Sequence, residues 1–291
     1  MITAKILSSS KTSDYENLNR LDMRIIHTQP DTDNKPQLEI TKAVIGIIAD
    51  LHTPYINTRL LNYMISIMKE RNVNNIILLG DYIDSESLST FSPKQYHMFK
   101  EELKDAKRLI KPLVDYLQTV DNVYYIEGNH EERYRKAIAN SLKELVDVVP
   151  DLNEILAKHD LIPKNTRYII VKEHGFLKVD KIFLMHGHEM GNKSSTNPTQ
   201  SLLRKAGTSN NIVFGHFHKY GLELFNNIND KTIFALSMPM AGDKRVRYLA
   251  NPQFHNGFGI YTVEKDRDSV LDIYVISESG RKIKELITSI R

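Results

Sequence analysis

The stretch NIILLGDYID, residues 75–84, is the clearest indicator of the fold. An uninterrupted apolar run leads directly into glycine and aspartate, which is typical of a strand that is buried on both faces and ends in a polar loop. The same arrangement is found before it in AVIGIIADLH (43–52) and after it in NVYYIEGNHE (122–131). Segments with helical periodicity separate these runs, so the pattern predicts a βαβα arrangement.

The later part of the sequence is richer in predicted strands. Its apolar runs are KIFLMHG (181–187), NIVFGH (211–216), TIFALSMP (232–239), GFGIYTVE (257–264) and SVLDIYVIS (269–277). A βαβα beginning followed by many strands suits a four-layer α/β/β/α sandwich with a central mixed β-sandwich better than a doubly wound sheet. We therefore expect an α/β fold of this kind over residues 42–291. Residues 1–41 are polar, and we expect an N-terminal arm or small subdomain that is partly ordered.

Three helices are predicted between the early strands. Residues 56–72 and 93–119 carry apolar side chains at spacings of three and four, and residues 131–147 also have a helical pattern. Ser92 and Pro93 are typical of a helix start, which predicts that the second helix begins at this point.

Composition limits the classes of function. The chain has 291 residues, of which 41% are hydrophobic, enough for a sizeable core. Lys and Arg number 39 against 36 Asp and Glu, and this near balance gives no support to a nucleic-acid-binding module without hydrolysis. The absence of cysteine excludes disulfides and thiolate-bound zinc. No apolar run reaches the roughly 18 residues of a membrane span, and no secretory signal is recognisable. We expect a cytoplasmic protein of phage or bacterial origin, with no membrane partner.

Five of the predicted strands end in groups that bind metals or phosphates. These groups are Asp50 and His52, Asp81 and Asp84, Asn129 and His130, His186 and His188, and His216 and His218. Loops at the carboxyl ends of strands converge on one crevice in α/β sheets, so these side chains should meet. One such motif arises by chance in many sequences, and a lone histidine at a strand end is more often structural. Five motifs, each directly after an apolar run, favour a dinuclear metal site.

The mixture of side chains matches the needs of phosphate-ester hydrolysis. Two divalent ions roughly 3.5–4 Å apart can neutralise the phosphate oxygens and activate a water. Imidazole and carboxylate ligands suit manganese, iron, zinc or nickel. An aspartate between the ions can bridge them, and a histidine beyond the ligands can protonate the leaving oxygen.

The order D-x-H, G-D-x-x-D, G-N-H-E, H-G and G-H-x-H resembles the calcineurin-like metallophosphoesterases over about residues 43–220. The resemblance implies two divalent ions, with manganese the first choice, and hydrolysis by attack of a metal-bridging hydroxide. It also implies the ligands of each ion: Asp50, His52, Asp81 and His218 for one, and Asp81, Asn129, His186 and His216 for the other. By the same resemblance His130 is the proton donor, and Asp84 is the carboxylate that orients it.

The sequence departs from the phosphoprotein phosphatases of this superfamily. Thr53 follows His52 where those enzymes have glycine, and Ser85 and Glu127 stand where they have phosphate-binding arginines. The closing G-H-F-H is similar to the nuclease and cyclic-nucleotide esterase branches. We therefore predict a phosphodiesterase or nuclease. The alternatives are a phosphomonoesterase, such as a protein phosphatase, and a non-catalytic metal-stabilised scaffold. A scaffold can dispense with the proton donor, so the presence of His130 favours an enzyme.

Two further residues have an open interpretation. Arg133 follows the G-N-H-E motif at a predicted helix start, where its guanidinium would bind phosphate or lie on a solvated helix face. His188 would contact the metals or the substrate, or be a bystander next to His186. The expected partner is a phosphate-ester substrate, with nucleic acid and nucleotides included.

Overall fold

The computed structural model describes most of the chain from residue 42 onward. The described residues are 5–6, 26–27, 37–39, 42–90, 96, 98–141, 144, 148–170, 176–188, 199, 210–226, 232–243, 254–264, 268–279 and 282–290. Most of the predicted N-terminal arm lies outside these ranges, so the division at residues 41 and 42 stays a prediction.

An eight-stranded mixed sheet forms the centre of the molecule, with the order β15-β14-β13-β4-β5-β6-β7-β2. Its strands are β2 (Ile26–His27), β4 (Lys42–Ile48), β5 (Asn75–Leu79), β6 (Asn122–Ile126), β7 (Arg167–Ile170), β13 (Asn256–Glu264), β14 (Val270–Ser279) and β15 (Lys282–Ile290). Strands β4 to β7 run parallel, whereas β13 to β15 are antiparallel. Three of the parallel strands, β4, β5 and β6, precede predicted metal-binding motifs.

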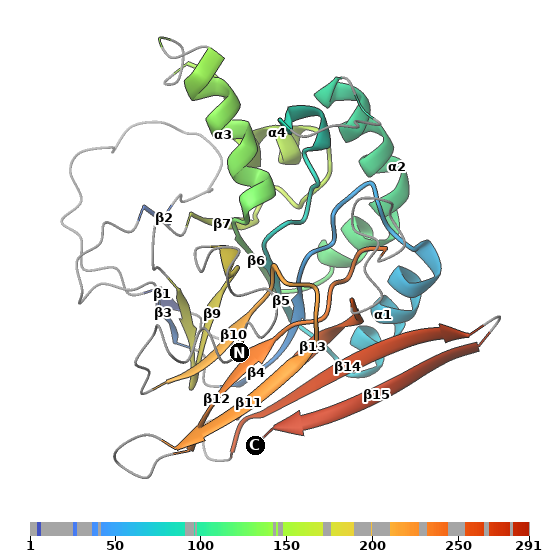
Figure 1. Cartoon of the computed structure of the whole chain (residues 1–291), viewed down its shortest axis with the longest axis vertical. Coiled ribbons are helices and arrows are strands. Elements are labelled where there is room, and N and C mark those ends of the chain that lie inside the picture. The colour runs from blue at the N-terminus through green and yellow to red at the C-terminus, as the bar shows by residue number, and fades with distance from the viewer. Residues whose placement is uncertain are drawn as a thin grey trace.

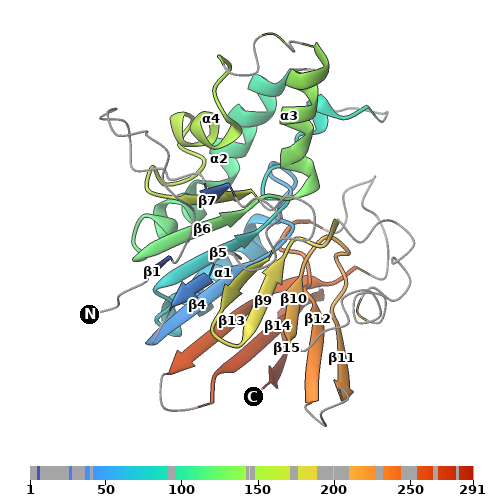
Figure 2. The same cartoon turned by 90° about the vertical axis from the view of Figure 1, so that its left-hand side faces the viewer.

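A seven-stranded mixed sheet packs against the first, with the order β1-β3-β8-β9-β10-β12-β11. Its strands are β1 (Lys5–Ile6), β3 (Gln37–Glu39), β8 (Leu177–Val179), β9 (Ile182–Met185), β10 (Asn211–Phe214), β11 (Gly221–Asn226) and β12 (Thr232–Ser237). Strands β9, β10 and β12 are parallel to one another. Figure 2 shows the two sheets, with β4 to β7 and β9 to β12 fanning out beside each other.

The helices are α1 (Thr58–Glu70), α2 (Phe99–Leu117), α3 (Asn129–Ser141) and α4 (Leu152–Lys158), with a 3-10 turn, η1 (Glu86–Leu88). The side chain of Asn57 begins α1 by accepting hydrogen bonds from the main-chain N–H groups of Arg59 and Leu60. None of the helices in the described part is both long and apolar enough to cross a membrane.

Helix α2 begins later than the predicted start at residue 93. Tyr96 lies outside the helix, where its main-chain N–H donates to Glu86 and its hydroxyl donates to Asp105. These contacts hold Tyr96 against η1 and α2, and Met98 takes the capping position. Ser92 and Pro93 lie outside the described residues.

Two hydrophobic cores explain the layer order. Helices α1 and α2 bury one face against the outer side of the eight-stranded sheet, as Figure 1 shows. The second core fills the space between the sheets and contains Ile45, Ile47, Ile77, Leu79, Tyr124 and Ile126 from one sheet and Leu184, Val213 and Leu236 from the other. Each such side chain contributes about 1.5–3 kcal/mol on burial. The continuous apolar runs of the sequence are thus strands covered on both sides.

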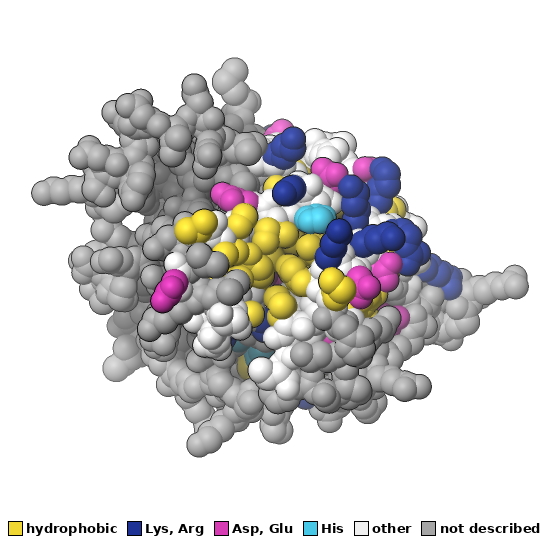
Figure 3. All heavy atoms as spheres, turned by 90° about the horizontal axis from the view of Figure 1, so that it is seen from above, with side chains coloured by type: hydrophobic (Ala, Val, Ile, Leu, Met, Phe, Trp, Pro, Cys, Tyr) yellow, Lys and Arg dark blue, Asp and Glu magenta, His cyan; other side chains and the backbone are white. Residues whose placement is uncertain are grey.

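The predicted α/β/β/α sandwich is confirmed as a mixed α/β fold with two packed mixed sheets. A helical layer on the outer face of the seven-stranded sheet is not found among the described residues. Seen from above in Figure 3, the helical end of the molecule displays apolar side chains next to a group of Lys and Arg side chains.

Candidate metal centre

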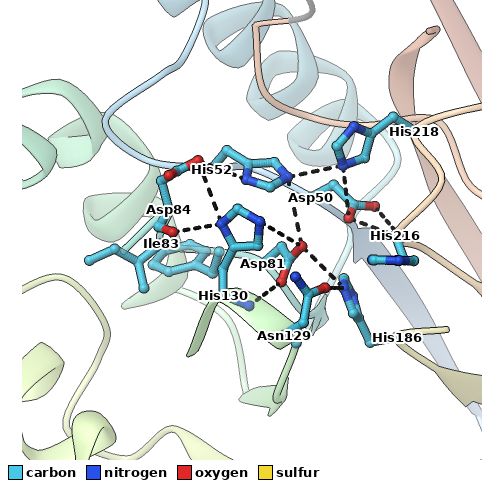
Figure 4. Close-up of polar contacts among 12 residues, drawn as sticks. Asp50, His52, Asp81, Ile83, Asp84, Asn129, His130, His186, His216 and His218 are labelled. Carbon is cyan, nitrogen blue, oxygen red and sulfur yellow. Dashed lines mark hydrogen bonds and ion pairs between the residues drawn. The ribbon is translucent and has the colours of Figure 1, made fainter. Parts of the chain in front are cut away.

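Both sheets contribute loops to one polar cluster at the carboxyl ends of their parallel strands. The loops after β4, β5 and β6 come from the eight-stranded sheet, and those after β9 and β10 come from the seven-stranded sheet. Figure 4 shows that all nine predicted metal-binding and catalytic residues meet there: Asp50, His52, Asp81, Asp84, Asn129, His130, His186, His216 and His218.

One part of the cluster has four candidate ligands around a common point. Asp50, His52, Asp81 and His218 are buried, and one ligand atom of each lies within 4.8 Å of the others. The Nε2 atoms of His52 and His218 are 3.0 Å apart. Nε2 of His218 is also 3.4 Å from Oδ1 of Asp50.

The second part shares Asp81 with the first. Asp81, His186 and His216 form another group with ligand atoms within 4.8 Å of one another. Nε2 of His186 lies 3.2 Å from Oδ2 of Asp81 and 3.1 Å from the amide oxygen of Asn129. Asp81 thus faces both groups, as a bridging ligand must.

The hydrogen-bond partners of two histidines explain why this cluster fits divalent metal ions. Nδ1 of His52 donates to Oδ2 of Asp84 at 3.1 Å, and Nδ1 of His186 donates to the main-chain oxygen of Leu79 at 2.9 Å. When neutral, as a metal ligand must be, each of these imidazoles would therefore present a lone pair on Nε2. These lone pairs point at other acceptors, including the amide oxygen of Asn129. Converging acceptors need a cation between them.

The buried acids create a strongly negative site. Burial raises the pKa of the Asp81 carboxyl, but His130 and His186 lower it more, so that it lies well below its ordinary value. Burial lowers the pKa of His186, but the carboxylate of Asp81 raises it more, to about 10. Burial and the neighbouring His186 lower the pKa of His216 to about 3. Ionised acids thus attract positive charge that divalent ions would supply in place of protons.

His130 is fixed next to the ligand groups by Asp84. Its Nδ1 lies 2.6 Å from the main-chain oxygen of Asp84 and 3.6 Å from the carboxylate. The carboxylate of Asp84 instead accepts the hydrogen bond from His52. The resemblance implied that the carboxylate orients His130, whereas the main-chain oxygen makes the closer contact. Asp84 therefore orients two imidazoles, one through each of its oxygen groups.

Glu131 was not singled out for a role from the sequence, yet it ties the loops of the site together. Its carboxylate is fully buried and accepts hydrogen bonds from the main-chain N–H groups of Asp81, Ile83 and Gly128 and from the hydroxyl of Tyr125. The loop after β5 and the loop after β6 thus share one anchor. Its place in the G-N-H-E motif was the only signal in the sequence.

The backbone of the site is unusual as well. Five of the candidate ligands have positive φ angles, namely Asp50, His52, Asp81, His216 and His218. Asp and His adopt this left-handed conformation more readily than most residues, but it still costs free energy. A Cβ on Gly128 would collide with the main-chain nitrogen and the carboxylate of Asp81. This glycine is therefore required for the close approach of the two loops.

The two residues with an open interpretation differ in their contacts. Arg133 reaches His130 and Asp84, with its Nη2 3.0 Å from Nε2 of His130. His188 is half-buried, and its ring centroid is 5.3 Å from that of His186. A cavity of about 310 Å³ next to α3 is lined by residues 132, 134–136, 138–139 and 149–151, and none of the candidate ligands contributes to it.

Comparison with known proteins agrees with this arrangement. The model of the calcineurin-like phosphoesterase family matches residues 43–236. The Gene 54 protein of Mycobacterium phage L5 is 23% identical over 241 residues, which cover 76% of this chain and 89% of the phage protein.

The solved structures that match this chain have lower sequence identity. Vacuolar protein sorting 29 from Cryptosporidium parvum is 16% identical and has a TM-score of 0.43, with 86% of this chain and 98% of that chain covered. A dimetal phosphatase from Danio rerio is 13% identical and has a TM-score of 0.42, with 84% and 98% covered.

Proposed function

This chain belongs to the calcineurin-like phosphoesterase family, and we propose that it is a hydrolase that cleaves phosphodiesters with two divalent metal ions. The observation that carries the proposal is the convergence of histidine lone pairs, an amide oxygen and ionised carboxylates on both sides of Asp81. A site of this kind binds hard or borderline divalent cations, and manganese is our first choice.

Each ion would have four protein ligands, with Asp81 common to both. Asp50, His52, Asp81 and His218 would hold one ion, and Asp81, Asn129, His186 and His216 would hold the other. When bound, the two ions would supply positive charge for the phosphate oxygens and lower the pKa of a water molecule. Asp84 and the main-chain oxygen of Leu79 would keep His52 and His186 in the tautomer that leaves Nε2 free for a metal.

His130 is the proposed proton donor to the leaving oxygen. Its Nε2 is 3.8 Å from Oδ2 of Asp81, so this nitrogen faces the position between the ions, while Nδ1 is held by Asp84. Burial lowers the pKa of His130, but Asp81 and Asp84 raise it above its ordinary value. A protonated imidazole at this position can transfer its proton to the departing alkoxide.

The lack of a free positive charge at two positions next to the ligands favours a diester substrate. Ser85 is fully buried, and Glu127 forms an ion pair with Arg135. These are the two positions at which phosphoprotein phosphatases have phosphate-binding arginines. A monoester dianion needs more positive charge than a diester monoanion. Nucleic acids and cyclic nucleotides are therefore the preferred substrate classes, and the similarity to a phage protein supports the predicted phage or bacterial origin.

The alternatives are a phosphomonoesterase and a metal-stabilised scaffold without activity. All the candidate ligands and His130 are present and meet at one site, which supports an enzyme. A scaffold would have no need for a histidine held at its Nδ1 with Nε2 facing the ligands.

A comparative assay tests the proposal. The purified protein would be loaded with manganese, iron, zinc or nickel and incubated with p-nitrophenyl phosphate, bis(p-nitrophenyl) phosphate, 2′,3′-cyclic nucleotides and single-stranded DNA. We expect diesters to be hydrolysed at least as well as the monoester. A strong preference for monoesters would identify a phosphomonoesterase. A protein that binds two ions and hydrolyses none of these substrates would be a scaffold.

A further inference from the structure

Arg133 contacts the same two residues that form the proposed acid-catalytic pair. Its Nη1 donates to the main-chain oxygen of Asp84 at 3.0 Å, and its Nη2 lies 3.0 Å from Nε2 of His130. The carboxylate of Asp84 is 3.8 Å from Nη1, too far for a hydrogen bond. The side chain of Arg133 is 23% exposed, so the guanidinium is reachable from solvent although it borders a buried site.

The helical geometry of α3 explains this position. Arg133 follows His130 by three residues, so both side chains lie on the same face of the first turns. Arg135, two residues further, points elsewhere and forms an ion pair with the buried Glu127. The two arginines therefore have different roles, because the charge of Arg135 is neutralised by a carboxylate in hydrogen-bonding contact and that of Arg133 is not.

The contact with Nε2 of His130 is the informative one. This nitrogen faces Asp81 and would have to reach the leaving oxygen of the substrate. Arg133 donates to it through one N–H, and a guanidinium has further N–H groups in the same plane. A phosphate group seated against His130 would therefore meet the guanidinium at hydrogen-bonding distance. Guanidinium binds phosphate oxygens more favourably than a neutral imidazole nitrogen, because the hydrogen bond is charge-assisted.

We propose that Arg133 is the phosphate-binding residue of this site: it binds a non-bridging oxygen of the substrate and thereby leaves Nε2 of His130, which then takes up a proton from solvent and transfers it to the leaving oxygen. The inference rests on the proposed function for the identity of the substrate. It assigns to the first turns of α3 one positive charge, where phosphoprotein phosphatases have two arginines at the positions of Ser85 and Glu127. Because the Coulomb attraction scales with ligand charge, Arg133 should favour a monoester dianion more than a diester monoanion.

Three variants test the proposal in the metal-loaded protein. Arg133→Ala removes the guanidinium, and Arg133→Lys keeps a charge without the planar pair of donors. Lys136→Ala is the matched control, because Lys136 lies on the same helix, is exposed and pairs only with Glu132 at the surface. The measurements are the dissociation constant of inorganic phosphate by calorimetry, kcat and KM for a monoester and a diester, metal content and Tm.

We expect Arg133→Ala to weaken phosphate binding and to lower kcat/KM by roughly 10- to 100-fold, the loss of one charge-assisted hydrogen bond. The loss should be larger for the monoester than for the diester and should appear mainly in KM. Arg133→Lys should recover part of the phosphate affinity. Metal content and Tm should match those of Lys136→Ala.

The proposal is overturned if phosphate affinity in Arg133→Ala changes no more than in Lys136→Ala. It is also overturned if metal content and Tm fall together with activity in both Arg133 variants, because Arg133 would then only support the structure. Failure of the proposed function gives a different result. In that case the wild-type protein hydrolyses no ester, while the phosphate titration still separates Arg133→Ala from the control.

Discussion

The two sheets contribute different chemistry to the same site. The loops of the eight-stranded sheet carry the three acids Asp50, Asp81 and Asp84 together with the proposed proton donor, His130. The described loop residues of the seven-stranded sheet carry the imidazoles of His186, His188, His216 and His218, and no carboxylate among them is a candidate ligand. The eight-stranded side thus provides the negative charge together with His52 and Asn129, and the other side provides imidazoles.

The two sides also differ in how they are held. On the eight-stranded sheet, the buried carboxylate of Glu131 joins the loops after β5 and β6 through three main-chain hydrogen bonds and accepts a fourth from Tyr125 in β6. On the seven-stranded sheet, the contacts run across to the other side: the main-chain N–H of His216 donates to Asp50, and His186 donates to the oxygen of Leu79. We infer that the eight-stranded sheet sets the geometry and that the histidines follow it.

The largest effect should come from Asp81, because it faces both groups of ligands. We expect Asp81→Ala to lose both ions and to reduce activity by more than the roughly 10²–10³-fold that one electrostatic contact provides. His216→Ala is the matched variant on the other sheet and should affect one ion only. Elemental analysis of both proteins gives the answer, and two tightly held ions per chain in Asp81→Ala would exclude a bridging role.

The second-largest loss of activity is expected for a substitution of His130, because it is the proposed acid on the eight-stranded side. His130→Asn is expected to keep both ions and to lose about 10²–10⁴-fold in kcat on substrates with poor leaving groups. With p-nitrophenolate the loss should shrink, because this leaving group needs little protonation. An equal loss for both kinds of substrate, measured under saturating conditions, would indicate a positioning role instead.

Glu131→Gln should destabilise the loops of the eight-stranded sheet, which we infer set the geometry of the site. Glutamine replaces one acceptor oxygen by an amide that faces buried donors, so we expect a loss of roughly 1–3 kcal/mol of stability. Metal affinity should fall by roughly 10- to 100-fold, as it does when residues that hydrogen-bond to metal ligands are substituted. Thermal unfolding and metal titration measure both. Tyr125→Phe removes one of the four donors and should have a smaller effect, and the opposite ranking would argue against an anchor.

The smallest effect is expected for His188→Ala on the seven-stranded side. The ring lies next to those of His186 and His216, but His188 is not part of either group of converging ligand atoms. Activity should change by less than about tenfold, below the effect of losing a single catalytic donor. Loss of an ion in this variant, detected by elemental analysis, would make His188 a ligand.

The sequence predicted the strands that are covered on both faces, because burial produces continuous apolar runs such as NIILLGD. Strands with less regular patterns were missed, for example β11 with the sequence GLELFN, whose last residues are exposed. Strand β8 is only three residues long and depends on its partner β9, so no local signal could define it. The start of α2 was also predicted too early, since contacts of Tyr96 outweigh the local capping pattern.

The sequence predicted which residue types form the candidate site, but it did not predict their geometry. The nine residues that the five motifs supplied as ligands or catalytic groups lie together in Figure 4. The hydrogen bond from His130 to the main-chain oxygen of Asp84 was not foreseen, because main-chain acceptors have no sequence signature. The anchoring role of Glu131 was missed for a similar reason: its partners are mostly main-chain N–H groups. Side-chain identity predicts chemistry, whereas loop conformation depends on the whole fold.

The left-handed backbone at Asp50, His52, Asp81, His216 and His218 has a consequence for how such a protein can evolve. Strained conformations of this kind cost on the order of 1–3 kcal/mol each, in a domain whose net stability is only about 5–15 kcal/mol. Glycine would adopt the same angles with less strain and without a buried charge or imidazole. Selection for thermal stability alone would therefore remove the ligands first. Their persistence requires continued selection for the chemistry, and large gains in stability should trade off against activity at this site.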